Sequence, residues 1–194
     1  MSNGVDRATL RFAEKVKIQF AFLESLGFRC IETNATLVRF ESPRILLNVF
    51  HGRKSYEIDI DFRAKRKRSD SYWLTNLLDL LGDTDCERGP YATHTVKGVK
   101  TGVQKLAQTF RRCIDSGVLD DPKLFTRLKA QSEKSIEEYV LEVALTHARN
   151  TVAIAWAKKD FSGVVRAFKP LQTHLTSTEA AKLAYATKQI KASH

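Results

Sequence analysis

The stretch from residue 36 to residue 62 constrains the fold more than any other part of this sequence. It contains three runs rich in β-branched and aromatic residues: TLVRFE (36–41), ILLNVFH (45–51) and SYEIDIDF (55–62). Only short links separate them, Ser42-Pro43-Arg44 and Gly52-Arg53-Lys54. Because links this short join antiparallel neighbours, the runs predict a three-stranded antiparallel meander.

The third run alternates strictly in polarity. Its apolar side chains are Tyr56, Ile58, Ile60 and Phe62, and its acidic ones are Glu57, Asp59 and Asp61. Successive side chains of a strand point to opposite faces of the sheet. One face of the meander is therefore expected in the core and the other in water.

A helix is expected over residues 6–26, where Leu10, Val16, Phe20 and Leu23 recur at helical spacing before a terminating Gly27. Its apolar stripe suits the apolar face of the meander. A second helix is expected over 71–81, ending at Gly82. The following residues, 83–94, contain Asp, Gly and Pro without periodicity and are expected to form a connecting loop.

The pattern is helical from residue 95 to the C-terminus. Within 122–159 the sequence allows one long helix or two shorter ones, with a shared stripe of Ile136, Val140, Val143 and His147. The predicted class is thus α+β: an N-terminal helix packed on a three-stranded antiparallel meander (1–82), a connecting loop (83–94) and an α-helical lobe (95–194).

Composition narrows the class of protein. No run of about 18 apolar residues occurs and the N-terminus lacks a secretory signal pattern, so a cytoplasmic protein without a membrane span is expected. The three cysteines are far apart and include no CxxC pair, which predicts reduced thiols. No cofactor-binding or catalytic motif is present, and we expect no cofactor and a non-enzymatic protein.

The net charge of +10 has one concentrated source, a basic run after the third predicted strand. It comprises Arg63, Lys65, Arg66, Lys67 and Arg68, with Arg53 and Lys54 in the preceding turn as further candidates. Such a run can bind phosphates without sequence preference, contact an acidic protein, or remain a solvated loop. All three interpretations are compatible with the sequence.

The acidic row of Glu57, Asp59 and Asp61 has two interpretations. Carboxylates at alternate positions of one strand can share a divalent metal ion, as in some nucleases. They can also pair with basic residues on neighbouring strands, for which Arg39, Arg44 and Arg53 are available. Paired sheet surface is the preferred interpretation, and a metal site is a weak candidate.

Two longer stretches resemble known proteins. FAFLESLGF leading into TLVRFESPRILLNVFHGRKSYEIDI, and later AWAKKDFSGVVRAFKPLQTHLTSTEAAKLAYATK, resemble small uncharacterised bacterial proteins, including immunity-type proteins that accompany polymorphic toxins. The segment 148–186 also resembles a tetratricopeptide-type helical hairpin. These resemblances imply a helix-plus-meander lobe joined to a helical lobe that acts by binding a partner.

The leading functional hypothesis is therefore a protein-binding module with a protein partner, and an immunity-type antidote is its narrower form. Non-specific nucleic-acid binding through Arg63 to Arg68 is the alternative. A metal-dependent nuclease using the acidic row is the least favoured.

Overall fold

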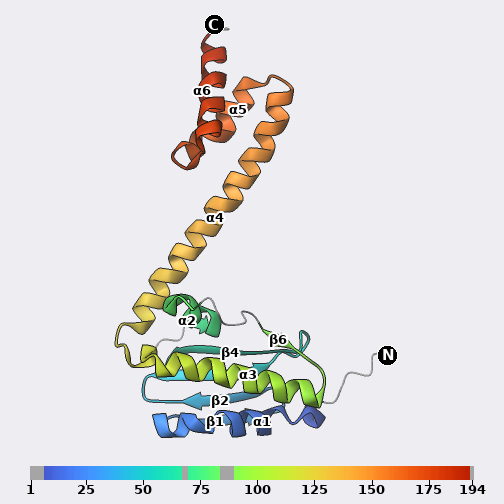
Figure 1. Ribbon diagram of the computed structural model, residues 1–194, viewed down its shortest axis with the longest axis vertical. Helices are drawn as coiled ribbons and strands as arrows, with labels where there is room; N and C mark the ends of the chain where they lie inside the picture. Colours follow the sequence, from blue (N-terminus) through green and yellow to red (C-terminus); the bar gives the residue numbers. More distant parts are fainter. Residues whose placement is uncertain (1–6, 67–69, 84–89, 193–194) are drawn as a thin grey trace. The chain divides into compact units, whose positions relative to one another are not determined.

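The computed structural model describes residues 7–66, 70–83 and 90–192 and divides the chain into two compact units. The first comprises Met1–Ser132 and the second Glu133–His194. Helix α4 (Leu124–Ala157) contributes to both, so residues 122–159 contain one helix rather than two. The mixed helical and antiparallel character agrees with the predicted α+β class (Figure 1).

The first unit is built on an antiparallel sheet in the order β1-β2-β3-β4-β5, with β6 also paired to β4. The strands are β1 (Arg29–Asn34), β2 (Leu37–Glu41), β3 (Ile45–His51), β4 (Glu57–Ala64), β5 (Ser71–Trp73) and β6 (Tyr91–Ala92). The predicted meander corresponds to β2, β3 and β4. A count of three strands was wrong because short or mostly exposed strands flank this meander on both sides.

The limits of two predicted elements also differ. Strand β4 begins at Glu57, because Tyr56 has a left-handed φ of 57° and belongs to the preceding turn. The predicted helix 71–81 begins as strand β5, and helix α2 covers only Leu74–Leu81. The side chain of Asn76 accepts a hydrogen bond from the Trp73 amide (2.8 Å), which fixes the first turn of α2.

The segment predicted as one N-terminal helix has three parts. They are a 3₁₀ turn η1 (Arg7–Leu10), helix α1 (Phe12–Gln19) and a second 3₁₀ stretch η2 (Ala21–Leu26). The predicted stop is confirmed, since Gly27 has a φ of 79° and the Phe28 amide donates to the Leu23 carbonyl oxygen at 3.0 Å.

Helix α3 (Val96–Asp115) belongs to the first unit rather than to a separate helical lobe. It lies with α1 on one face of the sheet (Figure 1). The apolar stripe of α3 is buried at Val99, Val103, Ala107 and Phe110 and joins the same core as β2 to β4. The division therefore lies after Ser132 and not within 83–94, because the apolar sheet face needs both helices to cover it.

Gly102 sits where α3 passes close to side chains of the sheet. A Cβ atom there would lie 2.5 Å from Cδ1 of Tyr91 and 3.0 Å from Cδ1 of Ile58. The glycine therefore permits a close approach between a helix and two strands, which the sequence analysis did not specify.

Gly102→Ala is expected to lower the free energy of unfolding by about 1–2 kcal/mol, because the overpacking cost exceeds the gain in helix propensity. Urea denaturation measures the change, with Thr101→Ala on the exposed side of α3 as the control. Combining Gly102→Ala with Tyr91→Ala should cost less than the sum of the two single changes. If the costs of the two single changes add strictly, the contact between position 102 and the Tyr91 ring is contradicted.

The second unit packs the C-terminal part of α4 against α5 (Phe161–Phe168), the 3₁₀ stretch η4 (Lys169–His174) and α6 (Ser177–Ala192). Its small core contains Ala148, Val152, Ala155, Val164, Phe168 and Ala186. The predicted caps are confirmed: Asp160 accepts from the Gly163 amide at 2.8 Å, and Thr176 and Glu179 form a reciprocal capping box. Glu179 also pairs with Arg149 at 2.7 Å, joining α6 to α4.

None of the helices in the described ranges is both long enough and apolar enough to cross a membrane.

Candidate functional site

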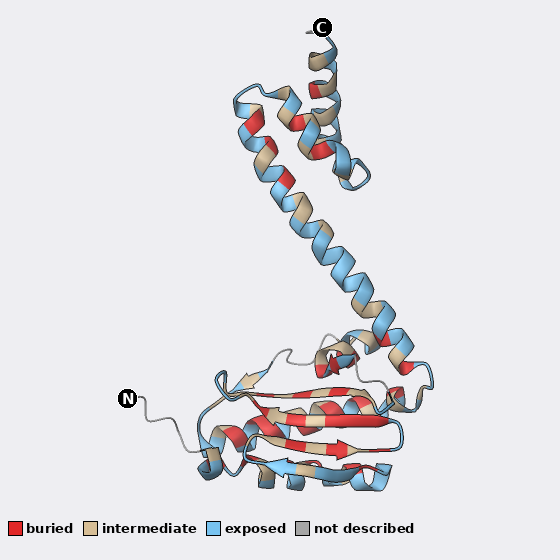
Figure 2. Cartoon of the chain, turned by 180° about the vertical axis from the view of Figure 1, so that it is seen from behind, coloured by how far each residue is buried: buried red, intermediate tan, exposed pale blue. Residues whose placement is uncertain are grey.

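One face of the sheet is turned away from α1 and α3. Figure 2 shows this face from outside, and no helix of the described part of the first unit lies over it. A row of polar side chains crosses four strands here: Arg39 pairs with Glu32 and donates to Asn48 at 2.8 Å, and Asn48 donates to Asp61 at 2.7 Å. The row continues to the half-exposed Trp73, which pairs with Asp61 between β5 and β4. The centre of its ring lies 5.6 Å from the centre of the Phe50 ring.

The acidic residues of β4 do not act as one group. Asp61 belongs to the polar row, so the predicted pairing with Arg39 is indirect, because β3 lies between β2 and β4. Asp59 instead accepts a hydrogen bond from the Ile60 amide at 2.7 Å. Within the described ranges, no group of three His, Cys, Asp or Glu residues could hold a metal ion. This finding covers the weak candidate set of Glu57, Asp59 and Asp61.

The candidate basic residues fall into two separate groups. Arg53 and Lys54 lie in the turn before β4, whereas Arg63, Lys65 and Arg66 lie at its far end. A strand of 8 residues separates the two groups by about 25 Å. Lys67 and Arg68 lie outside the described residues.

At the far end of β4, charge is partly compensated. The Lys65 ammonium is 2.5 Å from the Glu41 carboxylate. Arg44, which precedes β3, donates to the carbonyl oxygens of Asp120 and Asp121. The described part of the basic run is therefore a partly paired surface at the end of β4, with Arg66 exposed beside it.

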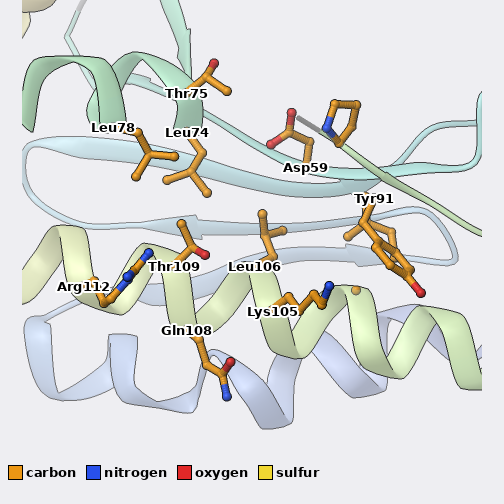
Figure 3. Close-up of a pocket in the computed structure, with 13 residues that line it drawn as sticks. Asp59, Leu74, Thr75, Leu78, Tyr91, Lys105, Leu106, Gln108, Thr109 and Arg112 are labelled. Atoms are coloured by element: carbon orange, nitrogen blue, oxygen red, sulfur yellow. The ribbon is translucent and has the colours of Figure 1, made fainter. Parts of the chain in front are cut away.

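A cleft of about 400 Å³ opens between β4, α2 and α3. Leucines from both helices form its apolar walls, and its polar groups include Asp59, Thr75, Thr109 and Arg112 (Figure 3). In this view the Arg112 guanidinium lies at lower left, and the Asp59 carboxyl group lies above it and to the right. The lining residues come from segments far apart in the chain, which no local sequence pattern brings together.

Burial raises the pKa of Asp59 to about 6, and the neighbouring carboxylates Asp61 and Glu57 act in the same direction. The hydrogen bond from the Ile60 amide opposes the shift. Burial also raises the pKa of Asp61, opposed by Asn48 and the nearby guanidinium groups of Arg39 and Arg63. A titratable group with a shifted pKa in a cleft is a candidate functional residue.

A second candidate site lies on α4 in the second unit. Ile136, Tyr139, Val140 and Val143 are exposed by 60%, 68%, 59% and 50% of their surface. Their spacing of three, four and seven residues places them on one face of the helix. We call these four residues the α4 stripe. The stripe lies on a different face from Ala148 and Val152, which pack against α5 and α6.

The α4 stripe leads into a groove. His147 and the exposed Ile154 continue it at helical spacing, and both line a groove of about 620 Å³ formed with α5. The two ends carry opposite charge: Glu133 and Glu137 flank the stripe, whereas Lys158 and Arg166 line the groove. The predicted stripe of Ile136, Val140, Val143 and His147 is thus present but exposed rather than covered.

Comparison of the chain with protein-family models, with curated proteins and with solved structures found no match.

Proposed function

We propose that this protein is a protein-binding module and that its second unit binds an amphipathic helix of the partner. The observation that supports this most directly is the exposed α4 stripe. Contiguous apolar patches of this kind are uncommon on monomeric proteins and often mark interaction sites. A partner helix that covered Ile136, Val140 and Val143 would remove this surface from water.

The charge at the two ends of the surface specifies the partner further. Glu133 and Glu137 favour basic residues at one end of the bound helix, and Lys158 and Arg166 favour acidic residues at the other. A second copy of α4 in the antiparallel direction has this charge pattern. An immunity-type role would instead make the partner a toxin of the same bacterium.

A photo-crosslinking amino acid in place of Val140 tests the proposal in the native cell. We expect a discrete protein adduct, because Val140 lies at the centre of the stripe. The same amino acid at Glu138, on the opposite side of α4, should give little or none of this adduct. The mass of the adduct distinguishes a second copy from a different protein.

Introducing charge should then abolish the contact. Ile136→Arg combined with Val143→Arg is expected to weaken partner binding by about a hundredfold or more, since charged side chains would be buried at the interface. The free energy of unfolding should change by less than about 0.5 kcal/mol, because these side chains are exposed. Glu138→Arg is the matched control. Equal adduct formation at positions 138 and 140, or unchanged binding by the double variant, would contradict the proposal.

A further inference from the structure

The cleft between β4, α2 and α3 is independent of the α4 stripe and lies wholly in the first unit. We infer that it binds a primary ammonium group carried on an apolar body, with Asp59 receiving the ammonium and the leucines holding the body. The inference rests on how the fold places Asp59, on the surroundings of its carboxylate and on the cleft walls.

The outer edge of β4 is interrupted at Asp59. Strand β5 pairs with Asp61 to Arg63, and β6 pairs with Glu57 and Ile58. Asp59 and Ile60 lie between these two pairings, in the gap where the cleft opens. The Ile60 amide donates to the Asp59 carboxylate at 2.7 Å, which holds the carboxyl group at this gap. A strand residue thus supplies an acidic group to a cleft walled by helices.

The carboxylate has no cationic partner in the described part of the chain. The Ile60 amide is its hydrogen-bond donor there, and no ion pair among the described residues includes Asp59. Arg112 lies 3.6 Å from the Asp83 carboxylate, and the Lys105 ammonium lies 5.7 Å from the centre of the Tyr91 ring. A partly buried carboxylate without a counter-charge gains stabilisation from a cation that enters the cleft.

The cleft walls suit an organic cation better than a metal ion. Leu74, Leu78 and Leu106 line the cleft, and Leu74 and Leu106 are the two drawn nearer to Asp59 (Figure 3). The volume of about 400 Å³ falls in the range of small-molecule sites. Divalent cations require several oxygen ligands, whereas an ammonium group needs one carboxylate and a few further acceptors. The cleft lining includes the hydroxyl groups of Thr75 and Thr109.

Such an ammonium group has two sources, a free amine and a lysine side chain of a bound protein. n-Hexylamine represents the first and Nα-acetyl-lysine methylamide the second. Titration of the full-length protein with each, followed by calorimetry or NMR, shows which binds more tightly. Tighter binding of either compound supports the inference and identifies the source.

The charge requirement is tested with matched ligands and variants. At about pH 7.5, hexanoate and hexanol should bind at least tenfold more weakly than n-hexylamine. Asp59→Asn should weaken amine binding at least tenfold, whereas Asp61→Asn, two residues along the same strand face, should retain it. Thr109→Trp, which fills the cleft and keeps the charge, should also abolish binding.

Binding should depend on pH. With a pKa of about 6, Asp59 keeps about a tenth of its charge at pH 5, so amine binding should weaken about tenfold between pH 7.5 and pH 5. The charged groups that face this region are Glu57, Asp61, Asp83, Lys105 and Arg112. Asp59→Asn should remove the dependence.

Three results would overturn the inference. They are the absence of binding by either amine up to about 10 mM, tighter binding of hexanoate than of hexylamine, and unchanged amine binding by Asp59→Asn.

Discussion

Phe110→Ala is expected to lower the stability of the first unit by about 3–5 kcal/mol and to leave the second unit unchanged. Phe110 is 1% exposed and lies on α3, with its ring centre 6.4 Å from that of Phe20. Phe20 in turn stacks on Phe40 of β2. Removing the Phe110 ring leaves a cavity between two helices and the sheet, which these residues cannot fill without moving.

The chain contains two tryptophans, which allow the two units to be followed separately. Trp73 lies in the first unit and Trp156 in the second. In a Trp156→Phe background, the fluorescence of Trp73 reports the first unit, and Phe110→Ala should shift its urea unfolding transition to lower urea concentration. In a Trp73→Phe background, the fluorescence of Trp156 reports the second unit, and Phe110→Ala should leave its transition unchanged. Phe168→Ala, in the core of the second unit, is the matched control with the reverse outcome. An equal shift at both tryptophans would contradict the two-unit division.

This experiment also tests where the chain divides. A division within 83–94 would place Phe110 in the helical lobe, with Trp156. Periodicity predicts that α3 has an apolar stripe, but it does not say which surface covers that stripe. The assignment of α3 to the sheet depends on long-range contacts, including the close approach at Gly102.

Local sequence patterns predicted those helices and strands that have one apolar, buried face and one polar, exposed face. The alternation in residues 57–62 correctly separated Ile58 and Ile60 from Asp59 and Asp61. Strand β1 gave no such signal, because it lies at the sheet edge and its residues are mostly exposed on both faces. The ends of helices were predictable where glycine or a capping side chain fixes the backbone locally, as at Gly27 and Asp160.

The candidate sites were less accessible to sequence analysis. The α4 stripe was visible as a period of three and four residues, but apolar periodicity normally indicates burial, and only the structure shows it exposed. The cleft brings together Asp59, Leu74 and Leu106, whose separation in sequence hides their proximity. The available signal was the alternation of apolar and acidic residues along β4. It placed Asp59 on the face opposite the core, but it did not show that the carboxyl group lies in the gap between the pairings with β5 and β6.

Asp59→Asn is expected to stabilise the first unit by about 1–2 kcal/mol at pH 8. Burial raises the pKa of Asp59 from 3.8 to about 6, so the folded protein binds a proton more tightly than the unfolded chain does. The full difference corresponds to about 3 kcal/mol, and the partial solvent exposure of the side chain reduces it. The amide oxygen of asparagine can still accept the hydrogen bond from Ile60.

The sign of the effect fixes its pH window. Because the folded pKa is raised, the wild-type protein loses stability as the pH rises from 3.8 through 6, and the variant lacks this loss. The difference between the two proteins should therefore be largest above pH 6 and disappear below pH 3.8. Urea denaturation at about pH 8, 6 and 4 measures it. Asp61→Asn, whose carboxylate already accepts from Asn48, should show a smaller gain.

A stabilising substitution at Asp59 would mean that the native residue costs the fold free energy. Such a cost is typical of binding and catalytic groups, whose surroundings are arranged for a ligand rather than for the empty protein. Addition of n-hexylamine should then raise the stability of the wild-type protein and not that of Asp59→Asn. If Asp59→Asn destabilises the protein at pH 8, the carboxylate is already compensated within the fold, and the argument for a ligand at this position fails.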